Sequence, residues 1–127
     1  MYEHLKEAVT FRKLMDQPVS KYDITVAPLQ LNLICEEYQE FMEAHYQAVN
    51  YPQDTPSREH ALKELTDLVY VAYQYAAAAG WDLDEALTRV HQSNLSKLDN
   101  NLRPIKREDG KVLKGPNYKP ATLTDLV

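Results

Sequence analysis

The chain has 127 residues, a formal net charge of −5 and an apolar share of 44%, which suits one globular domain or one subunit of an assembly. The acidic balance excludes the basic surface of a nucleic-acid-binding protein, and no apolar run approaches the roughly 18 residues of a membrane-spanning helix. All three glycines lie at or after position 80, so helices are favoured over a turn-rich β fold.

Residues 2–16 form the first predicted helix, because apolar side chains recur there at helical spacing and Pro18 follows them. Residues 18–27 form a predicted loop. A loop of this length either covers a substrate, through Lys21 and Tyr22, or is a plain surface connection.

The second predicted helix covers residues 28–49 and begins with a proline in its first turn. One line along this helix, at steps of four, four, three and four, consists of Leu29, Leu33, Glu37, Glu40 and Ala44. The two carboxylates continue the apolar stripe, whereas a solvated acidic face would lie opposite the leucines. Because buried carboxylates need partners, the line indicates pairing or metal binding.

A third predicted helix, residues 58–79, follows the turn-rich segment 50–56 and has Ser57 as its N-cap. Glu64 and Asp67 are again three residues apart and lie in line with apolar residues.

If the second and third helices pack antiparallel, four carboxylates meet, and only a cation makes their closeness tolerable. Hard divalent ions such as Mg²⁺ prefer oxygen ligands of this kind. The alternative is a pair of exposed acidic patches without metal.

Beyond Asp67 the third helix is apolar or aromatic almost all round. Such a helix needs burial, and a chain of this length offers few places for it. We therefore expect Tyr70, Tyr73 and the alanines that follow to pack against another subunit of a homo-oligomer.

A fourth predicted helix follows the helix stop at Gly80 and runs to about residue 98. His91, Asn94 and Lys97 form a polar ridge along it, each three residues from the next. An amide and an ammonium group at this spacing can hold one phosphate, while His91 alone is more simply a core or surface residue.

Residues 99–127 contain more glycine, proline and lysine, and residues 107–114 predict a β-hairpin with an Asp-Gly turn. The segment is either a cationic flap over a phosphate chain or a solvated tail on a neighbouring subunit. We therefore divide the chain into an all-α domain, residues 1–101, and an extended tail or hairpin, residues 102–127, that covers the site or a neighbour.

The single cysteine, Cys35, excludes an internal disulfide and fits a reducing compartment, and we expect it to be a small buried residue beside the acidic motif. The N-terminus has no apolar core of signal-peptide length. Together these features predict a cytoplasmic, all-α protein with no membrane or nucleic-acid partner. Its four-carboxylate Mg²⁺ site would bind a polyphosphate and activate water for attack on phosphorus.

Two motifs carry a resemblance to a known group of enzymes. Glu36-Glu37-x-x-Glu40, followed by Glu64-x-x-Asp67, resembles the E-E-x-x-E…E-x-x-D signature of the all-α nucleoside triphosphate pyrophosphohydrolases, the MazG-like and phosphoribosyl-ATP pyrophosphohydrolase-like enzymes.

The second motif lies in the C-terminal third. Residues 91–97, 110–114 and 117–120 resemble the S-N-M-S-K…G-K-V-x-K…Y-x-x-P ending of small members, including phage ones, with Leu95 where methionine is common. The resemblance spans residues 33–120.

The resemblance implies a four-helix MazG-like bundle subunit that assembles through its helices as a dimer or a dimer-of-dimers tetramer. It implies hydrolysis of an NTP or dNTP to the monophosphate and pyrophosphate by water attack at the α-phosphorus. The cofactor would be Mg²⁺, replaceable by Mn²⁺, with two or more ions per site. Carried over by position, the metal ligands would be Glu37, Glu40, Glu64 and Asp67. The catalytic residues would be Glu36, Glu37 and Glu40, with Glu36 orienting the attacking water.

Phosphate and substrate contacts would come from the polar ridge and the tail, namely His91, Asn94, Lys97, Lys111, Lys114 and Tyr118. Because some phage relatives act on dGTP or GTP, guanine nucleotides are the expected substrates, and the cytoplasm of a bacterium or a phage-infected host is the expected location. The alternatives are a phosphoribosyl-ATP pyrophosphohydrolase and a non-catalytic nucleotide-binding helical protein.

Overall fold

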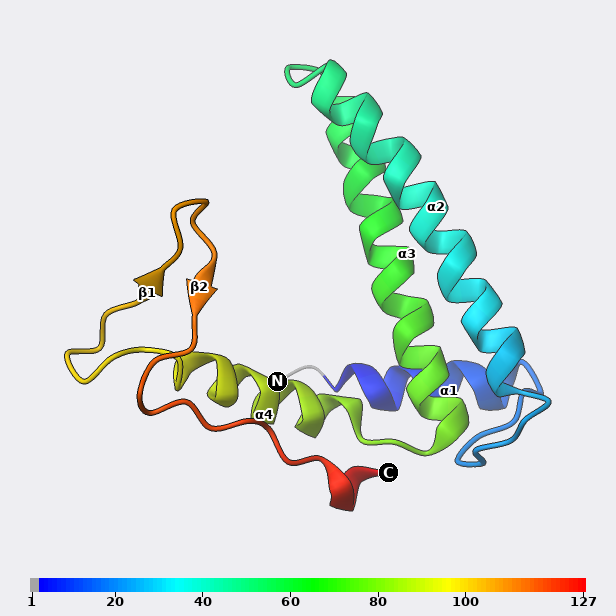
Figure 1. The fold of residues 1–127 in the computed structure, drawn as a ribbon. Helices are drawn as coiled ribbons and strands as arrows, with labels where there is room; N and C mark the ends of the chain where they lie inside the picture. The colour runs from blue at the N-terminus through cyan, green and yellow to red at the C-terminus, as the bar shows by residue number, and fades with distance from the viewer. Residues whose placement is uncertain (1–2) are drawn as a thin grey trace. The chain divides into compact units, whose positions relative to one another are not determined.

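The computed structural model describes residues 3–127, which are mostly helical with one small two-stranded sheet (Figure 1). The elements, in chain order, are α1 (His4–Leu14), α2 (Ala27–Asn50), α3 (Thr55–Ala79), α4 (Leu83–Leu95), β1 (Ile105–Lys106), β2 (Val112–Leu113) and a 3-10 helix (Thr124–Leu126). The chain divides after Trp81 into two compact units, which are described in turn. The prediction of an all-α protein with four helices is confirmed at this level.

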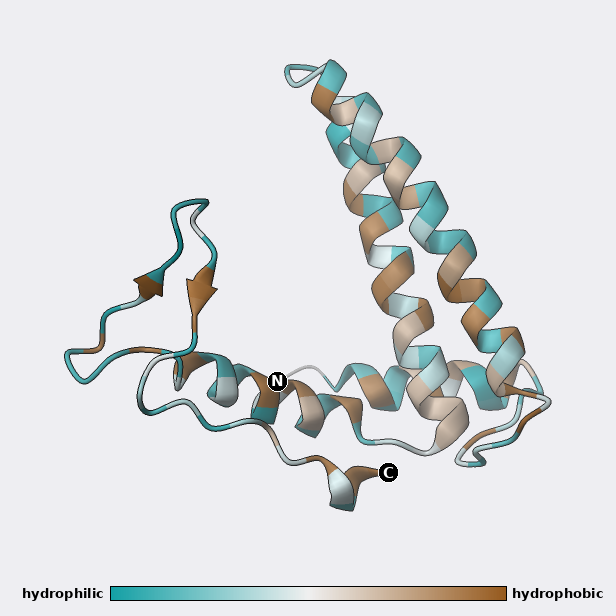
Figure 2. Ribbon diagram, in the orientation of Figure 1, coloured by the Kyte–Doolittle hydropathy of each residue, from teal (hydrophilic) through white to brown (hydrophobic). Residues whose placement is uncertain are grey.

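In the first unit, α2 and α3 form a long antiparallel hairpin, and α1 packs against α3 (Figure 1). Hydrophobic residues recur along both helices of the hairpin, with hydrophilic residues between them (Figure 2). The short connection of residues 51–54 fixes the hairpin, so residues at matching heights on α2 and α3 face each other.

The start of α3 differs from the prediction. Asp54, not Ser57, is the N-cap, and its carboxylate accepts hydrogen bonds from the Ser57 backbone nitrogen at 3.2 Å and from Ser57 Oγ at 2.5 Å. Pro56 therefore lies inside the first helical turn, where the missing N–H group costs nothing.

The loop between α1 and α2 closes the other end of α3. The backbone nitrogens of Ser20 and Lys21 donate to the carbonyl oxygens of Ala77 and Ala78, at 2.9 and 2.7 Å. These carbonyls belong to the last helical turn, which has no helical partners for them. Gly80 ends the helix at φ 81°, and a Cβ there would lie 2.9 Å from Ser20 Cα, so the close approach requires glycine.

One prediction about α3 is corrected by the packing of α1 and of this loop against α3. Tyr73 and the alanines 76–78 are buried within the chain itself rather than left for another subunit. The buried Arg12 of α1 reinforces the junction, because its Nε donates to Pro18 O at 2.6 Å and its Nη1 to Gln74 Oε1 at 3.4 Å.

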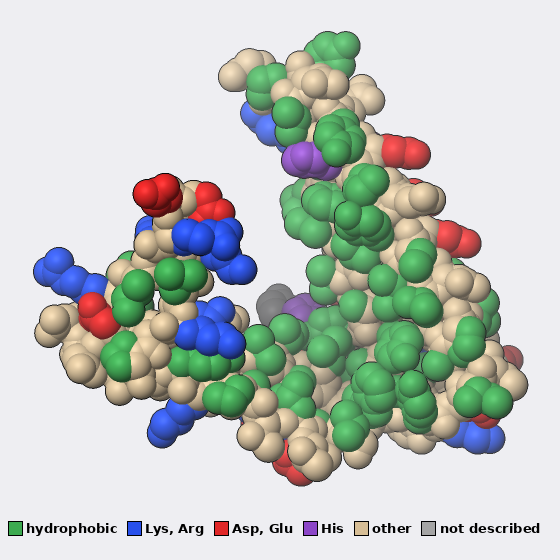
Figure 3. Space-filling model, viewed as in Figure 1, with side chains coloured by type: hydrophobic (Ala, Val, Ile, Leu, Met, Phe, Trp, Pro, Cys, Tyr) green, Lys and Arg blue, Asp and Glu red, His purple; other side chains and the backbone are tan. Residues whose placement is uncertain are grey.

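The rest of the hairpin keeps a large apolar surface. Hydrophobic side chains cover much of the face of the hairpin that Figure 3 shows. Exposed examples on α3 are Leu62, Leu65, Val69 and Tyr70, the last at 41% exposure. Every helix among residues 3–127 is nevertheless too short or too polar to cross a membrane.

The second unit consists of α4, the hairpin of β1 and β2, and a C-terminal segment that returns to α4. Ile105 pairs with Leu113 and Lys106 with Val112, and Gly110 lies in the connecting turn at φ 90°. The predicted hairpin is confirmed, with a first strand that begins two residues before the predicted range, while α4 ends at Leu95 rather than near residue 98.

Candidate metal and substrate site

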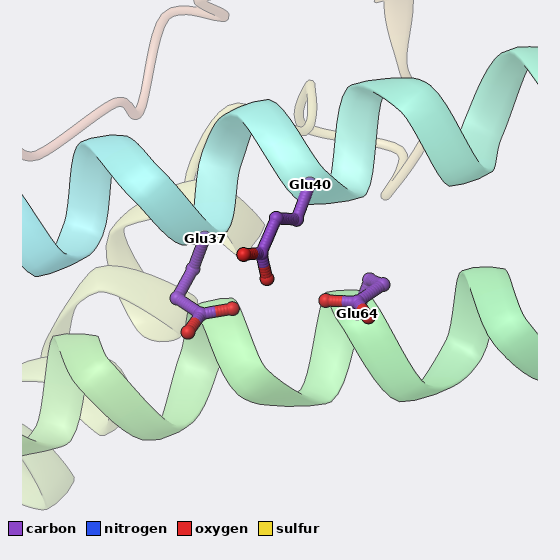
Figure 4. Close-up of side chains that lie close together, drawn as sticks. All are labelled: Glu37, Glu40 and Glu64. Carbon is purple, nitrogen blue, oxygen red and sulfur yellow. The ribbon is translucent and has the colours of Figure 1, made fainter.

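Three glutamates meet in the seam between α2 and α3. Glu37 and Glu40 project from α2 and Glu64 from α3, and one carboxylate oxygen of each lies within 4.8 Å of the others. Figure 4 shows the three side chains directed into the space between the two helices. The three-residue spacing puts Glu37 and Glu40 on one face of α2, and the antiparallel packing brings that face to α3.

Two oxygens of this cluster are buried without a hydrogen-bond partner, Glu37 Oε2 and Glu64 Oε2. Glu64 as a whole is only 7% exposed. Burial raises the pKa of Glu37 above its ordinary value of 4.5, and the contact with Glu40 and the charges of Glu40, Asp67 and Glu64 raise it further. Buried acceptors without donors destabilise a fold, so these two oxygens call for a positively charged or hydrogen-bonding partner.

Asp67, the fourth predicted ligand, lies outside the group of three. Its carboxylate accepts a hydrogen bond from Lys63 Nζ. It is still close enough that its charge helps to raise the pKa of Glu37. The structure therefore brings three of the four predicted carboxylates together and pairs the fourth with a lysine.

Lys63 and His60 were not among the predicted site residues. Lys63 Nζ and His60 Nδ1 each lie 3.8 Å from Glu64 Oε1, and the hydrogen bond to Asp67, followed by the charges of Asp67, Glu64 and Glu37, raises the pKa of Lys63. The signal was present in the sequence, because residues four apart on a helix are neighbours: His60 precedes Glu64, and Lys63 precedes Asp67, by four.

Glu36 and Cys35 face elsewhere. Both are exposed and, with Gln39, line a surface depression on α2, so Glu36 does not join the three clustered glutamates. The expectation that Cys35 is buried is wrong. The cause is that, among residues 3–127, α2 packs extensively against α3 alone, which leaves its far side open.

The donor set of the cluster is all oxygen and all carboxylate, which suits a hard divalent cation such as Mg²⁺ or Mn²⁺. A bound cation would supply the missing partner of the two buried oxygens. The residues present therefore fit a metal ion.

In the second unit, the C-terminal segment is anchored along one stripe of α4. Arg89 donates to both oxygens of Asp125, at 2.6 and 2.9 Å, and to Thr122 O at 3.0 Å. Ser93 Oγ donates to Lys119 O at 2.7 Å, and the Lys119 backbone nitrogen donates to Ser96 Oγ at 2.9 Å. These bonds assign the two serines of the S-N-x-S-K motif to holding the tail.

The predicted polar ridge lies on a different side of α4 from that stripe. On a helix, residues 89, 93 and 96 share one face, whereas residues 91 and 94 lie on another. His91 and Asn94 are exposed, and Lys97 is half-buried just past the end of α4. Of the predicted tail residues, Lys114 and Tyr118 meet, with the lysine Nζ 4.8 Å from the ring centroid, while Lys111 is exposed beside the hairpin turn.

Comparison with known proteins adds one finding. The family model described as phosphoribosyl-ATP pyrophosphohydrolase matches residues 5–94, a range that includes both acidic pairs and ends at Asn94. No curated protein matches the chain. Enzymes of this kind hydrolyse phosphorus anhydrides and typically depend on a metal. The chain, with its acidic cluster on a helical hairpin, belongs to the phosphoribosyl-ATP pyrophosphohydrolase family of the MazG-like all-α superfamily.

Proposed function

We propose that the protein is a Mg²⁺-dependent nucleoside triphosphate pyrophosphohydrolase that converts an NTP or dNTP to the monophosphate and pyrophosphate. The observation that carries this proposal is the convergence of Glu37, Glu40 and Glu64, with two buried and unpartnered oxygens, in a chain of a pyrophosphohydrolase family. The guanine nucleotides dGTP and GTP are the first substrates to test, because the resemblance is to small phage members.

In this proposal, Glu37, Glu40, Glu64 and Asp67 hold the metal, with two or more ions per site. When bound, the metal supplies positive charge to the phosphate oxygens and promotes ionisation of the attacking water. Hydrolysis at the α-phosphorus then breaks the bond to the β-phosphate and releases pyrophosphate.

The chain's own groups have distinct parts in this scheme. Glu37 holds a proton more readily than an ordinary glutamate because it is buried among other acids. Besides holding metal, the Glu37 carboxylate is assigned as the acceptor of the proton that the attacking water loses. Glu40 is the exposed member of the cluster, and in this proposal it faces the bound substrate. The proposed role of Glu36 is to orient the attacking water.

Binding of the triphosphate is assigned to the cationic and polar residues of the second unit. Asn94 and Lys97 would contact phosphate oxygens together with His91, and the tail would contribute Lys111, Lys114 and Tyr118. We further propose that residues 1–101 form the pyrophosphohydrolase domain and that the tail, residues 102–127, covers the site or a neighbouring subunit.

A second candidate function is hydrolysis of phosphoribosyl-ATP, which the matched family model favours. Both reactions break the same type of anhydride at the α-phosphorus, and the substrates differ because phosphoribosyl-ATP carries an additional phosphoribosyl group. A panel of the eight common NTPs and dNTPs together with phosphoribosyl-ATP, with Mg²⁺ or Mn²⁺, separates them when products are resolved by chromatography. The expected product is pyrophosphate rather than orthophosphate.

Variants connect that activity to the cluster. Glu64→Gln and Glu40→Gln should each reduce turnover by about a hundredfold or more, because each removes a charged ligand. Glu43→Gln is the matched control, since Glu43 is exposed on α2 outside the cluster, and it should retain activity. Full turnover in a folded Glu64→Gln variant would refute the metal assignment, and nucleotide binding without turnover in the unmodified protein would establish a non-catalytic binder.

A further inference from the structure

We propose that Lys63 is a displaceable counter-ion, which holds Asp67 out of the glutamate cluster while metal is absent and releases it when a divalent cation binds. This inference rests on the proposed function, because it concerns the same site. It assigns to Lys63 the task of setting how tightly the site binds metal.

Lys63 connects the two acidic residues of α3. Its Nζ donates to Asp67 Oδ2 and lies 3.8 Å from Glu64 Oε1. Glu64 and Asp67 are one helical turn apart on the same face. The ammonium group therefore neutralises the part of the site that α3 contributes.

The lysine does not satisfy the inner part of the cluster. Glu64 presents Oε1 to both Lys63 and His60, whereas its Oε2 is buried without a partner, as is Glu37 Oε2. Lys63 is 65% exposed as a side chain and Glu64 only 9%. The positive charge thus sits at the solvent edge of the cluster, and the unpartnered oxygens lie on its buried side.

The contact is of a kind that a divalent ion can replace. An exposed lysine–carboxylate pair contributes little stability, because water screens it and the long side chain loses freedom. The ammonium group sits on a flexible stem and is readily hydrated when released. The electrostatic attraction between three or four carboxylates and a doubly charged ion is far stronger than their attraction to the single charge of the ammonium group that the ion displaces.

Removal of the lysine charge should therefore strengthen metal binding. A unit positive charge about 5 Å from a divalent ion weakens its binding by about tenfold, even with the screening of bulk water. Lys63→Met keeps the length and helix propensity of the side chain and removes the charge. Lys63→Arg keeps the charge and should preserve the weaker affinity.

The test is calorimetric titration of the full-length, nucleotide-free protein with Mn²⁺ at one fixed pH and ionic strength. Lys63→Met should bind Mn²⁺ about tenfold more tightly than the unmodified protein. The matched control is Lys6→Met, because Lys6 also pairs with an exposed carboxylate, that of Glu3 at 3.7 Å, but away from the cluster. It removes the same charge and should change affinity by less than about twofold.

A second measurement identifies the partner that Lys63 releases. In an Asp67→Asn background, Lys63→Met should increase the affinity for Mn²⁺ by less, because the residue that the lysine holds back no longer carries charge. Thermal unfolding supports the same point: saturating Mn²⁺ should raise the melting temperature more in Lys63→Met than in the unmodified chain. If Lys63→Met does not fold, Lys63→Gln removes the charge with a hydrophilic side chain.

The outcomes separate the inference from the proposed function. Equal Mn²⁺ affinity in Lys63→Met and the unmodified protein would overturn the counter-ion role while leaving the metal site in place. Weaker affinity in Lys63→Met would overturn it too, and would show that the lysine positions the ligands. Absence of Mn²⁺ binding in every variant would overturn both the inference and the metal site.

Discussion

Within the acidic cluster, burial and repulsion from neighbouring carboxylates raise the pKa of Glu37. One of its carboxylate oxygens is buried and lacks a donor, and its charged neighbours are Glu40, Glu64 and Asp67. The folded chain therefore holds a proton on this group more tightly than the unfolded chain does, and loss of the proton weakens the fold.

This predicts an unusual dependence of stability on pH without metal. The contribution of Glu37 is fully present below its ordinary pKa of 4.5 and is lost as pH rises through the raised pKa of the folded state. Glu37→Gln, which cannot lose a proton, should therefore be more stable than the unmodified protein at neutral pH in a chelator. Saturating Mn²⁺ should reverse the order, because the amide is a poorer ligand than the carboxylate.

Melting temperatures at several pH values, with chelator or with Mn²⁺, check this prediction. Glu43→Gln serves as the control, since it makes the same change outside the cluster. If Glu37→Gln were less stable than the unmodified protein at neutral pH in chelator, repulsion among the acids would not be the dominant effect.

Residue spacing located Glu37, Glu40 and Glu64, because a helix fixes which side chains share a face. It could not place Asp67, because the rotamer of that side chain depends on competition between the cluster and Lys63 for its carboxylate. Spacing also separated Glu36 from Glu37, because adjacent residues point about 100° apart on a helix and only Glu37 falls on the apolar line of α2 that faces α3.

Among the elements, α4 and the C-terminal segment depend on a few polar contacts. Arg89 binds Asp125 through two nitrogens and reaches Glu85 as well. The arginine keeps the pKa of Asp125 below its ordinary value of 3.8, so this contact is present above that value and is lost as pH falls through the lowered pKa.

Asp125→Asn should loosen the segment of residues 119–126 on α4 at neutral pH, because it removes a charged two-bond contact. Amide hydrogen exchange of that segment should accelerate about two- to fivefold, the range of exposed ion pairs. Asp109→Asn is the matched control, since Asp109 pairs with Arg107 inside the hairpin instead. Unchanged exchange in Asp125→Asn would assign the anchoring to Ser93, Ser96 and the hydrogen bond from Arg89 to Thr122 O.

Helix positions followed from the sequence, but the start of α3, the end of α4 and the segments that bury the end of α3 did not. The start of α3 was placed too late because Pro52 and Pro56 both resemble turn residues, although a proline also suits a first helical turn. The burial of the end of α3 was assigned to another subunit because periodicity shows that a helix is apolar without showing what covers it. Here α1 packs against α3, with His4 beside Tyr73, and the loop that contains Ser20 bonds to the last turn at Ala77 and Ala78.

At the scale of the whole molecule, the apolar surface of α3 remains the feature to explain. Leu65, Val69 and Tyr70 are each more than two-fifths exposed, and with α1 they line a surface pocket of about 350 Å³. Exposed apolar patches of this kind mark protein interfaces, and we propose that this surface joins copies of the chain into a homo-oligomer.

Val69→Lys should therefore lower the molar mass in solution toward the 14.7 kDa of one chain, because a buried charge disfavours the interface. Sedimentation or light scattering at micromolar concentration measures the mass. Leu102→Lys is the control, since Leu102 is exposed at 79% in the second unit. If the molar mass of the unmodified protein in solution were already that of a single chain, the proposed oligomer would be contradicted.

The loop that covers the end of α3 has a consequence for local motion. The amide hydrogens of Ser20 and Lys21 are committed to carbonyl oxygens of Ala77 and Ala78, so this stretch cannot lift away while the last helical turn stays intact. The backbone amide hydrogens of Ser20 and Lys21 should then exchange with solvent at the same rate as those of the last turn of α3. Fraying of that turn and opening of the loop become a single event, shared between parts of the chain more than fifty residues apart in sequence.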